Sequence, residues 1–335
     1  MRILTNTTKI GKLLSNYAEV EVLKVRTLRD LISKVDINSY DLIYFAKYTP
    51  PLLDLGLINQ SRTKGKLMIG MHVPVKIDHI NRPHHIIYNL LMPMQTTYYL
   101  RMLGAYLHVL NKDDEEYLRN RVHSRLNSRV IYAPLFTDTS IFKPGNKYGT
   151  FTLLYSARAS WQKGTDIAVK IIERLIMELR DNIEIKIVAY GPLTHLYNKL
   201  RKFRNIEILN YLPLDEFSSV LSKSHVLLFT SRYESFAQLP LDSLASGTPV
   251  VSFNVRGFVK DYVIKDKVLG KYIVDFNDVD NIVDRVIELA KYWYNNENYY
   301  HELVKYSRQF AERFSIENIS KIYLDVFTNI INNAT

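Results

Sequence analysis

Hydrophobic and polar residues alternate in short blocks along the first part of the chain. The segment EVEVLKV at Glu19–Val25 alternates with a period of two, which predicts a strand. Leu28–Val35 and Asp113–Arg121 have helical spacing, whereas the polar residues that follow Thr5 predict a loop. Strands that alternate with helices indicate a parallel α/β sheet. The other strands predicted here are Met1–Thr5, Asp41–Phe45, Lys66–Met71, Ala105–Leu110 and Arg129–Ala133.

The same alternation restarts after Phe142–Gly149, whose sequence FKPGNKYG is typical of a linker. Near the end of the chain, the run Tyr292–Tyr300 predicts a helix end followed by a loop. We therefore expect two doubly wound α/β domains, with a ligand cleft at the carboxyl ends of their strands. The strands predicted in this half are Phe151–Ser156, Glu184–Tyr190, Ile206–Leu209, Val226–Thr230, Thr248–Phe253 and Lys271–Val274, and the helices are Thr165–Leu179, Leu214–Ser222, Val279–Asn295 and Ile316–Ile331.

The composition narrows the class of protein. A chain of 335 residues, 47% of them hydrophobic, is expected to form about two globular domains. There is no cysteine, which excludes a disulfide scaffold and thiolate chemistry. The N-terminus lacks the pattern of a signal peptide, and no apolar run is long enough to span a bilayer. These features predict a cytoplasmic protein, either soluble or peripheral to a membrane.

The formal net charge of +10 favours acidic partners, namely nucleotides, anionic lipids or nucleic acid. A charge of this size also serves solubility alone. Because the basic residues are spread along the chain and form no Lys/Arg block, nucleic acid is the least favoured of these partners.

Two cations follow a predicted strand in the second half. The segment LLYSARASWQKG at Leu153–Gly164 places Arg158 at the end of the strand and Lys163 before the next helix. Arginine offers a planar fork to phosphate oxygens, and lysine offers a mobile point charge. Two cations at the carboxyl end of a parallel strand suit a diphosphate, and a solvated basic loop is the alternative.

Two further segments have residues suited to a ligand. In VAYGP, Gly191 permits close approach of the backbone to a ligand, or makes an ordinary turn. The segment SRYESFAQLPLDSLASGTPVV at Ser231–Val251 carries Glu234 in a loop and Asp242 in the next helix. The helix start can bind an anion and the carboxylates can accept hydrogen bonds from hydroxyls. Two acids at this spacing also fit a helix whose early acid complements its dipole.

The order and spacing of these segments resemble glycosyltransferase family 4, whose members have the GT-B fold. The family's Gly-Arg and Lys-Gly pairs correspond to Ala157-Arg158 and Lys163-Gly164. Its V-x-G-x-G-P strand end corresponds to VAYGP, and its S-x-x-E-x-F-G…E-A-x-A-x-G-x-P-V-V segment to Ser231–Val251. With NIEILNYLP at Asn205–Pro213, which corresponds to the family's N-V-x-x-x-G-x-V/L-P segment, there are four motifs in order, and together they are more specific than any one of them.

The resemblance extends from about Leu153 to the C-terminus, and it includes NIEILNYLP at Asn205–Pro213. Over the first half only the α/β rhythm, GMHVP and IYAPLFTDTSIFKP align with the family. The resemblance implies two Rossmann-like domains that face a central cleft. Residues 1–145 would form the acceptor-side domain and residues 150–313 the donor domain, while a C-terminal helix at about 314–335 would cross back to the first domain.

The resemblance also implies roles for individual residues. Arg158 and Lys163 would bind the donor diphosphate and stabilise the departing nucleotide. Glu234 would contact the donor sugar, and Asp242 the ribose hydroxyls. His72, at a strand end, would lie near the reacting sugar, with a hydrogen-bonded structural histidine as the alternative. The remaining donor-binding residues would be Phe236, Ala237 and Gln238 through their backbone N–H groups, Gly191 at the strand end, Tyr211 and Leu212 at the base, and Gly11 in the first loop near the phosphate.

The chain departs from the family pattern at three positions. Ala157 and Ala237 stand where the family has glycine, and Asp242 stands where it has a glutamate that is one methylene longer. A D-x-D triplet begins at Asp278, and we interpret it as the N-cap of the following helix instead of a metal site. No cluster of ligands has metal spacing, so we expect no essential metal.

The segment Arg82–Arg101 mixes basic, aromatic and apolar residues. It fits an anionic membrane surface or a lipid-linked acceptor. It also fits a pair of helices packed on the first domain, which is the interpretation that we favour.

The predicted function is metal-independent transfer of a sugar, with retention, from a UDP- or GDP-linked donor to a glycan, lipid or protein acceptor. A nucleotide sugar would be the substrate and no cofactor is expected. A GT-B sugar phosphorylase or epimerase, and a sugar- or nucleotide-binding module without catalysis, remain alternatives.

Overall fold

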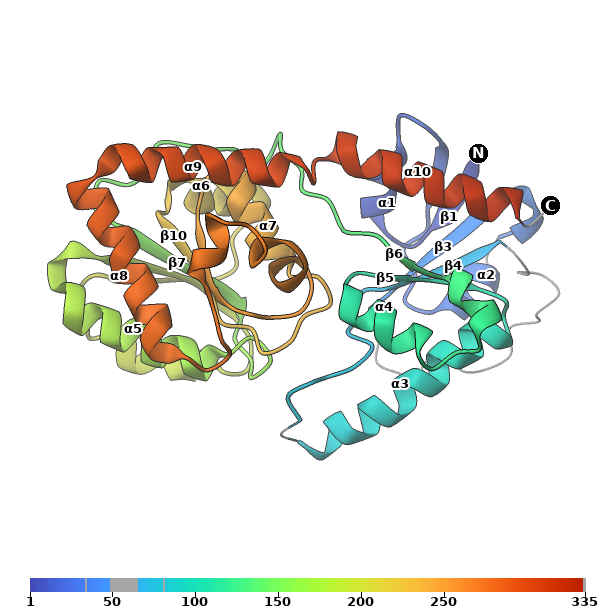
Figure 1. The fold of residues 1–335 in the computed structure, drawn as a ribbon, viewed down its shortest axis with the longest axis horizontal. Coiled ribbons are helices and arrows are strands. Elements are labelled where there is room, and N and C mark those ends of the chain that lie inside the picture. The colour runs from blue at the N-terminus through green and yellow to red at the C-terminus, as the bar shows by residue number, and fades with distance from the viewer. Residues whose placement is uncertain (34, 49–65, 81, 334–335) are drawn as a thin grey trace. The chain divides into compact units, whose positions relative to one another are not determined.

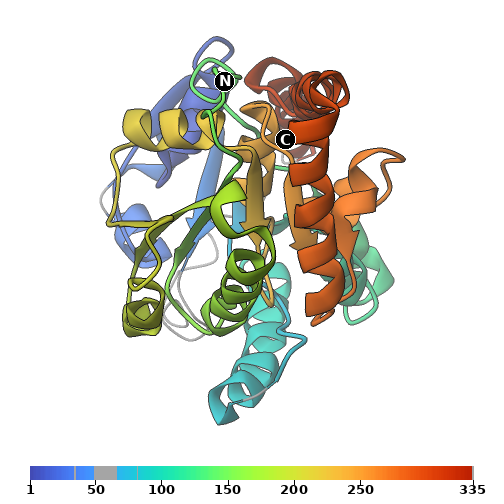
Figure 2. The ribbon, with the colours of Figure 1, turned by 90° about the vertical axis from the view of Figure 1, so that its left-hand side faces the viewer.

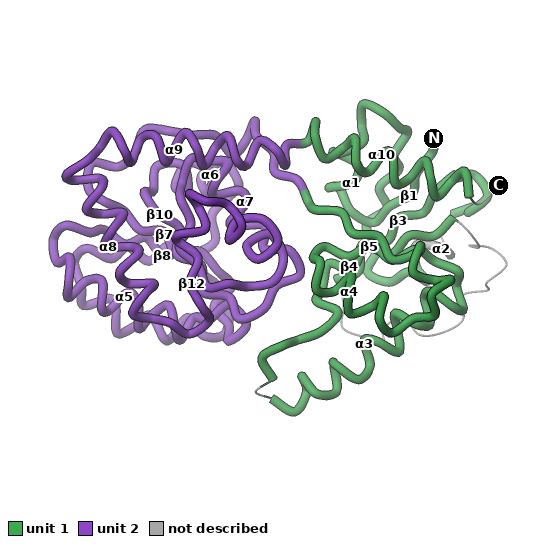
Figure 3. The backbone as a smooth tube through the Cα atoms, in the orientation of Figure 1, with its two compact units in different colours: residues 1–135, 316–335 green, residues 136–315 purple. Residues whose placement is uncertain are grey.

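The computed structural model describes residues 1–335 except 34, 49–65, 81 and 334–335. The chain divides into two compact units (Figure 3): the first unit contains residues 1–135 and 316–335, and the second contains residues 136–315. The chain first leaves the first unit after Leu135, so the segment predicted as a linker, Phe142–Gly149, belongs to the second unit. The C-terminal helix belongs to the first unit.

The first unit is built on a six-stranded sheet in which all paired strands are parallel. In sheet order its strands are β2 (Glu19–Val22), β1 (Arg2–Thr5), β3 (Leu42–Lys47), β4 (Leu67–Met71), β5 (Tyr106–Val109) and β6 (Val130–Tyr132). Its helices are α1 (Thr8–Leu14), α2 (Leu28–Ser33), α3 (Pro83–Arg101), α4 (Lys112–Arg119) and α10 (Ile316–Asn332).

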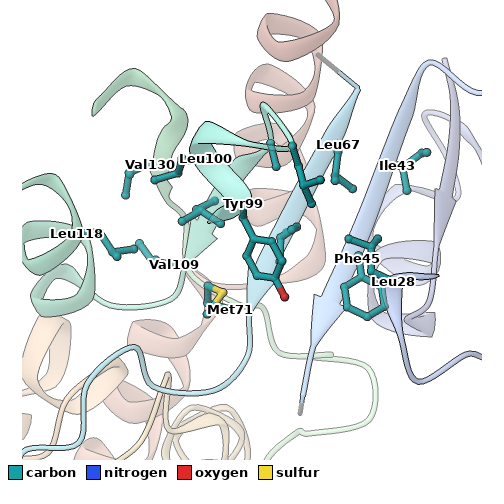
Figure 4. Packing of buried hydrophobic residues seen from close by; sticks show 14 of the residues in the cluster. Leu28, Ile43, Phe45, Leu67, Met71, Tyr99, Leu100, Val109, Leu118 and Val130 are labelled. Carbon is teal, nitrogen blue, oxygen red and sulfur yellow. The ribbon is translucent and has the colours of Figure 1, made fainter. Parts of the chain in front are cut away.

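Alternate residues of these strands point to opposite faces of the sheet. On one face, Phe45, Met71 and Val109 pack in one hydrophobic cluster with Tyr99 of α3 and Leu118 of α4 (Figure 4). On the other face, α1 and α10 pack against each other. Both faces of the sheet are thereby covered, as expected for a parallel sheet.

The loop predicted after Thr5 is wrong, because these residues form helix α1. The side chain of Thr7 caps the helix by accepting a hydrogen bond from the backbone N–H of Lys9, and Ile10 is buried with Leu13 and Leu14. Gly11 therefore lies inside a helix and not in a loop. A Cβ on Gly11 would lie 3.1 Å from Val22 Cγ2, so this glycine allows α1 to pack closely on β2.

The pair of helices predicted at Arg82–Arg101 is also wrong, because the segment forms the single helix α3. Pro83 stands at the start of the helix, where its missing N–H costs nothing. Pro93 lies inside the helix and does not end it. Within the described ranges, no helix of the protein combines the length and apolar character needed to cross a membrane.

The second unit repeats the architecture with another six-stranded parallel sheet and helices on both sides of it (Figures 1 and 2). The prediction of two doubly wound α/β domains is confirmed. In sheet order the strands are β12 (Ile273–Val274), β11 (Val250–Phe253), β10 (Val226–Phe229), β7 (Thr152–Arg158), β8 (Glu184–Tyr190) and β9 (Ile206–Leu209). The helices are α5 (Thr165–Leu179), α6 (Leu214–Lys223), α7 (Gln238–Ala245), α8 (Val279–Asn295) and α9 (Glu297–Glu312).

The prediction of a helix end and a loop at Tyr292–Tyr300 is wrong in its second part. Helix α8 ends at Asn295, and α9 begins two residues later. Asn296 makes this short break, because its side chain accepts a hydrogen bond from the backbone N–H of Tyr299 and so caps α9. Helix α9 then packs along α7.

Candidate donor-binding site

The carboxyl ends of β7 and β10 lie beside each other because these strands pair in parallel, with Val226 opposite Leu153. Arg158 is the last residue of β7, and its side chain is exposed. Gly164 caps the start of α5 with a φ of +68°, and a Cβ there would lie 2.1 Å from the carbonyl oxygen of Thr230. Only glycine fits both the dihedral angle and the contact. The loop after β7 is thus held directly against the end of β10.

An ion pair joins these two loops. Lys163 Nζ lies 2.5 Å from Glu234 Oε1, and the two side chains are 27% and 10% exposed. The hydroxyl of Thr230 donates to the carbonyl oxygen of Lys163 at 2.9 Å, which fixes the backbone below the pair. Glu234 is nearly buried, whereas the Lys163 side chain is partly exposed to solvent. This arrangement can offer both a cation and a carboxylate to one polar ligand.

Arg232, which was not among the residues predicted from the sequence, also holds these two loops together. Its guanidinium donates to both carboxylate oxygens of Asp166 at 2.7 and 2.8 Å and to the carbonyl oxygen of Trp161 at 2.6 Å. It also lies over the Trp161 ring, 4.5 Å from the ring centroid. Burial alone would raise the pKa of Asp166, but the hydrogen bonds and charge of Arg232 outweigh it and lower that pKa. A basic residue two positions before Glu234, with an acid at the start of the partner helix, was the available signal.

The backbone between Glu234 and α7 is unusual. Ala237 has a φ of +68° and a ψ of +64°, the left-handed conformation that glycine adopts more easily. The preceding carbonyl, of Phe236, accepts a hydrogen bond from the N–H of Phe258 at 2.5 Å. A Cβ on Gly257 would lie 2.4 Å from that same oxygen. The loop after β11 therefore packs tightly against the turn into α7 and holds it in place.

Asp242 lies on the second turn of α7 and is held by its neighbours. Its Oδ1 accepts hydrogen bonds from Thr137 Oγ1 at 2.8 Å and from Gln238 Nε2 at 2.9 Å. The amide of Gln238 also donates to the carbonyl oxygen of Phe136 at 3.0 Å. Gln238 thus contributes a side chain as well as the backbone N–H that the sequence suggested. These bonds fix the orientation of the Asp242 carboxylate.

On the other side of β7, exposed aromatic residues lie at or just beyond the carboxyl ends of β8 and β9. Tyr190, the last residue of β8, is 55% exposed, and Tyr211, after β9, is 73% exposed. Their ring centroids are 6.2 Å apart at an angle of 77°. Gly191 follows with a φ of +122°, and a Cβ there would lie 3.1 Å from the carbonyl oxygen of Ala159. Leu212, next to Tyr211, is half-buried.

Two predicted site residues belong to the first unit. His72 follows β4 directly and is half-buried. Its Nε2 lies 3.2 Å from the hydroxyl oxygen of Tyr44. Burial, followed by the charges of His108 and Lys9, holds the pKa of His72 well below its usual range. Gly11, as described above, lies within α1.

The D-x-D triplet has the predicted capping role. The carboxylate of Asp278 caps α8 by accepting hydrogen bonds from the backbone and side chain of Asn281, both at 3.1 Å. Asp280 pairs with Arg174. In the part of the chain that the structure describes, no group of three or more His, Asp or Glu side chains could hold a metal ion.

Comparison with known proteins identifies the family of this chain. Residues 136–310, slightly more than half of the chain, match the family described as Glycosyl transferases group 1. An uncharacterized glycosyltransferase of Methanocaldococcus jannaschii is 25% identical over 218 residues, covering 62% of this chain and 57% of that relative. The chain spans about half the length of the first curated relatives that it matches.

Solved structures show the same fold. The crystal structure of Anabaena HepE in complex with UDP and glucose has a TM-score of 0.70 at 11% identity, covering 98% of this chain and 99% of that one. The structure of WaaG, a glycosyltransferase involved in lipopolysaccharide biosynthesis, has a TM-score of 0.66 at 11% identity, covering 98% and 100%. The chain therefore has the GT-B fold and belongs to the group 1 glycosyl transferase family.

Proposed function

We propose that this protein transfers a sugar from a nucleotide-sugar donor to a glycan, lipid or protein acceptor, with retention at the anomeric carbon and without a metal ion. The observation that carries the proposal is the pair of Lys163 and Glu234, held at the carboxyl ends of β7 and β10, the edge of the sheet at which Arg158 ends β7. Family membership supports transfer. The UDP and glucose bound by HepE favour UDP as the first nucleotide to test, with GDP second.

The role proposed for each residue follows from the chemistry of its side chain. Arg158 and Lys163 neutralise the diphosphate, on which negative charge grows as the bond to the sugar breaks. Glu234 accepts hydrogen bonds from the sugar hydroxyls, and Asp242 accepts them from the ribose. Because Lys163 is already paired with Glu234, donor binding would place sugar and phosphate on either side of an existing ion pair. The N–H groups at Phe236, Ala237 and Gln238 add the positive end of α7.

Two further contacts complete the proposed site. The exposed Tyr211, next to Leu212 and Gly191, offers an aromatic face to the base.

No carboxylate in this group is assigned as a covalent nucleophile, and the leaving phosphate would take the proton of the acceptor. His72 would act on the donor sugar from the first unit. Gly11 has no proposed ligand contact, because its place inside α1 is explained by packing on Val22.

Calorimetric titration with UDP, GDP, ADP and their sugar conjugates tests donor binding. We expect one nucleotide to bind in the presence of EDTA, and Lys163→Met to weaken it by about tenfold or more. Lys199→Met is the matched control, because Lys199 forms an exposed pair with Glu173 in the same unit. If none of the nucleotides or nucleotide sugars binds, the proposal that this protein uses a nucleotide-sugar donor is wrong.

Slow hydrolysis of the donor tests the reaction without a known acceptor. Proton NMR of the sugar released at early times shows its anomeric configuration, which retention requires to match that of the donor. Consumption of inorganic phosphate in place of nucleotide release would instead indicate a phosphorylase, and inversion at a ring carbon other than C1 an epimerase.

We further propose that helix α3 makes peripheral contact with an anionic membrane. Ile86, Ile87, Leu90 and Met94 are 52% to 66% exposed and follow one another at helical spacing. The helix contains no acidic residue and ends at Arg101. An apolar stripe with basic ends suits the boundary between acyl chains and anionic headgroups.

Sedimentation with lipid vesicles tests this contact. We expect binding to vesicles of phosphatidylglycerol and phosphatidylcholine, weaker binding to phosphatidylcholine alone, and loss of binding in Leu90→Glu. Met177→Glu is the control, since Met177 is 64% exposed on α5 in the second unit. Equal loss in both variants, or no binding by the unmodified protein, would contradict the contact.

A further inference from the structure

A chain of buried polar side chains crosses the middle of the first sheet and ends at His72. Tyr44 lies on β3, His108 on β5 and Tyr323 on α10, and all three are 1% exposed or less. The hydroxyl of Tyr44 lies 2.8 Å from His108 Nδ1 and 3.2 Å from His72 Nε2. His108 Nε2 lies 2.9 Å from the carbonyl oxygen of Ala133.

Strand β4 lies between β3, which carries Tyr44, and β5, which carries His108, and it leaves room for their contact. Gly70 on β4 is paired with His108 on β5. A Cβ on Gly70 would lie 2.1 Å from the hydroxyl oxygen of Tyr44 and 3.2 Å from Cδ2 of His72. Glycine within a strand weakens it and often marks a close approach. Here the missing side chain gives the Tyr44 hydroxyl its place between the two imidazoles.

The direction of every hydrogen bond in this chain follows from one fixed acceptor. A carbonyl oxygen only accepts, so the Nε2 of His108 must carry a hydrogen. Burial lowers the pKa of His108 to about 4, so at neutral pH its Nδ1 has a lone pair. The hydroxyl of Tyr44 must therefore donate its single hydrogen to Nδ1 of His108. Toward His72 the same oxygen can only accept, so the Nε2 of His72 is the donor.

We propose that Tyr44 and His108 are positioning residues that hold His72 in the tautomer with its hydrogen on Nε2 and its lone pair on Nδ1. The relevance of this tautomer to catalysis rests on the proposed function of His72, but the tautomer itself does not. In this tautomer Nδ1 of His72 is an acceptor, and the contact of Nε2 with Tyr44 helps to fix the orientation of the ring. Tyr323, whose oxygen lies 3.3 Å from the Nε2 of His108, is a second acceptor for that donor.

Long-range proton–nitrogen NMR of protein labelled with ¹⁵N-histidine reads the tautomer directly, with no donor or acceptor present. In the unmodified protein we expect His72 to have a protonated Nε2 and an unprotonated Nδ1, assigned by its loss in His72→Gln. In Tyr44→Phe, which keeps the ring and removes the hydroxyl, we expect a mixture of tautomers. Tyr17→Phe is the control, because Tyr17 is 50% exposed in the same unit.

The outcomes separate the tautomer from the proposed reaction. A protonated Nδ1 in the unmodified protein overturns the inference at once, whether or not Tyr44→Phe folds, and so does an unchanged tautomer in a folded Tyr44→Phe. In the donor assay we expect Tyr44→Phe to lower kcat about tenfold with little change in KM. If His72→Ala keeps full activity while the NMR result holds, the proposed role of His72 fails and the positioning inference stands.

Discussion

The two units share an architecture, but the proposed donor site in the second unit and the hydrogen-bonded chain in the first unit place their polar groups differently. In the second unit, charged pairs such as Lys163 with Glu234 lie in loops beyond the strand ends. In the first unit, the polar groups of Tyr44 and His108 lie inside strands and are fully buried. Loop charges keep contact with water, so they need only partial pairing. Groups inside a sheet must satisfy one another, because an unpaired buried polar group is costly.

This difference gives the two sites different sensitivities. In the proposed donor site a ligand would contact the loop charges directly, so removing one charge should cause a large loss of function. A buried neutral chain acts through geometry, so removing one hydroxyl changes orientation more than it changes charge. We therefore expect the largest functional losses in the second unit and finer effects in the first.

Removal of either member of the loop ion pair should have the largest effect. We expect Glu234→Ala and Lys163→Ala each to lower kcat by about 10³-fold, equivalent to about 4 kcal/mol, since Lys163 would act on the charge that develops on the leaving diphosphate, and Glu234 would position both Lys163 and the sugar. Tyr44→Phe, at about tenfold, is the comparison in the first unit. Donor hydrolysis followed by nucleotide release measures all three.

The control for this series is Lys199→Ala, which removes one member of the exposed pair with Glu173. It should leave kcat within a factor of two, because an exposed pair contributes little. Full activity in both site variants would contradict the assignment of the loops as the donor site. A loss in Tyr44→Phe as large as in Lys163→Ala would remove the contrast between the units.

The residues of the proposed loop site could be selected from the sequence, whereas the contacts of the buried chain could not, and the reason is physical. Arg158, Lys163 and Glu234 stand out because charged residues directly after apolar strands break the hydrophobic pattern. His108, within the strand segment AYLHVL, gave the same kind of signal, but its partners are set by the pairing of three strands. No local pattern shows that Gly70 would leave room for the hydroxyl of Tyr44.

The errors in the predicted elements have similar causes. Helix α1 was predicted as a loop because polar residues surround Ile10 and hide its helical spacing with Leu13 and Leu14. Helix α9 was missed because Asn296 makes a break of a single residue, and the aromatic residues around it resemble a helix end. In both cases the capping side chain, Thr7 or Asn296, was the signal available in the sequence. Long strands with uniform apolar character were predicted well.

Lys147, a half-buried lysine in the second unit, should have the next largest effect, on the stability of the fold. Lys147 Nζ donates to the carbonyl oxygens of Ser222, Ser224 and Gly247 at 2.6 to 3.0 Å and to Thr248 Oγ1 at 2.9 Å. We expect Lys147→Met to lower the free energy of unfolding by about 3 to 4 kcal/mol, because these acceptors lose their donor.

Chemical denaturation at pH 6 measures the effect of Lys147→Met. Burial lowers the pKa of Lys147 to about 7, so the amine carries its charge at this pH. Lys143→Met is the control, because Lys143 is exposed a few residues earlier, and its change should stay within about 0.5 kcal/mol. If Lys147→Met lowers the free energy of unfolding by less than 1 kcal/mol, the segment around Lys147 is held by its apolar contacts.

The buried histidines predict a loss of stability in acid that can be separated by unit. Burial lowers the pKa of His108 to about 4, and burial together with the charges of Lys147 and His301 lowers that of His225 to about 3. The unfolded chain takes up each proton below about 6.5, before the folded protein does. The stabilisation is complete above pH 6.5 and decreases as the pH falls toward 4. For His108 the loss is about 3 kcal/mol.

Hydrogen exchange of β5 and β10, measured between pH 7 and 4.5 and corrected for intrinsic rates, reads the two units separately. In His108→Gln we expect the acid-induced loss of protection to shrink in β5 and to persist in β10. An unchanged pH dependence in β5 would show that other groups govern the acid stability of the first unit.

The smallest expected effect concerns backbone strain, which also differs between the units. Among the residues that the structure describes, three non-glycine residues have a positive φ, namely Arg180, Ala237 and Asn277, and all lie in the second unit. An alanine in this conformation costs about 1 to 2 kcal/mol, while glycine costs about 0.5 to 1 kcal/mol in chain entropy. Ala237→Gly should therefore raise the free energy of unfolding by about 0.5 kcal/mol.

Ala245→Gly is a control with the opposite expected sign. Because Ala245 lies in helix α7, its replacement by glycine should lower the free energy of unfolding by about 1 kcal/mol. Denaturation midpoints of the two variants decide the sign. If Ala237→Gly is less stable than the unmodified protein, the turn is held by its contact with Gly257 and Phe258, and its left-handed residue carries no strain. If it is more stable and also binds the nucleotide more weakly, the loss of rigidity before α7 explains why a strained alanine is retained beside Glu234.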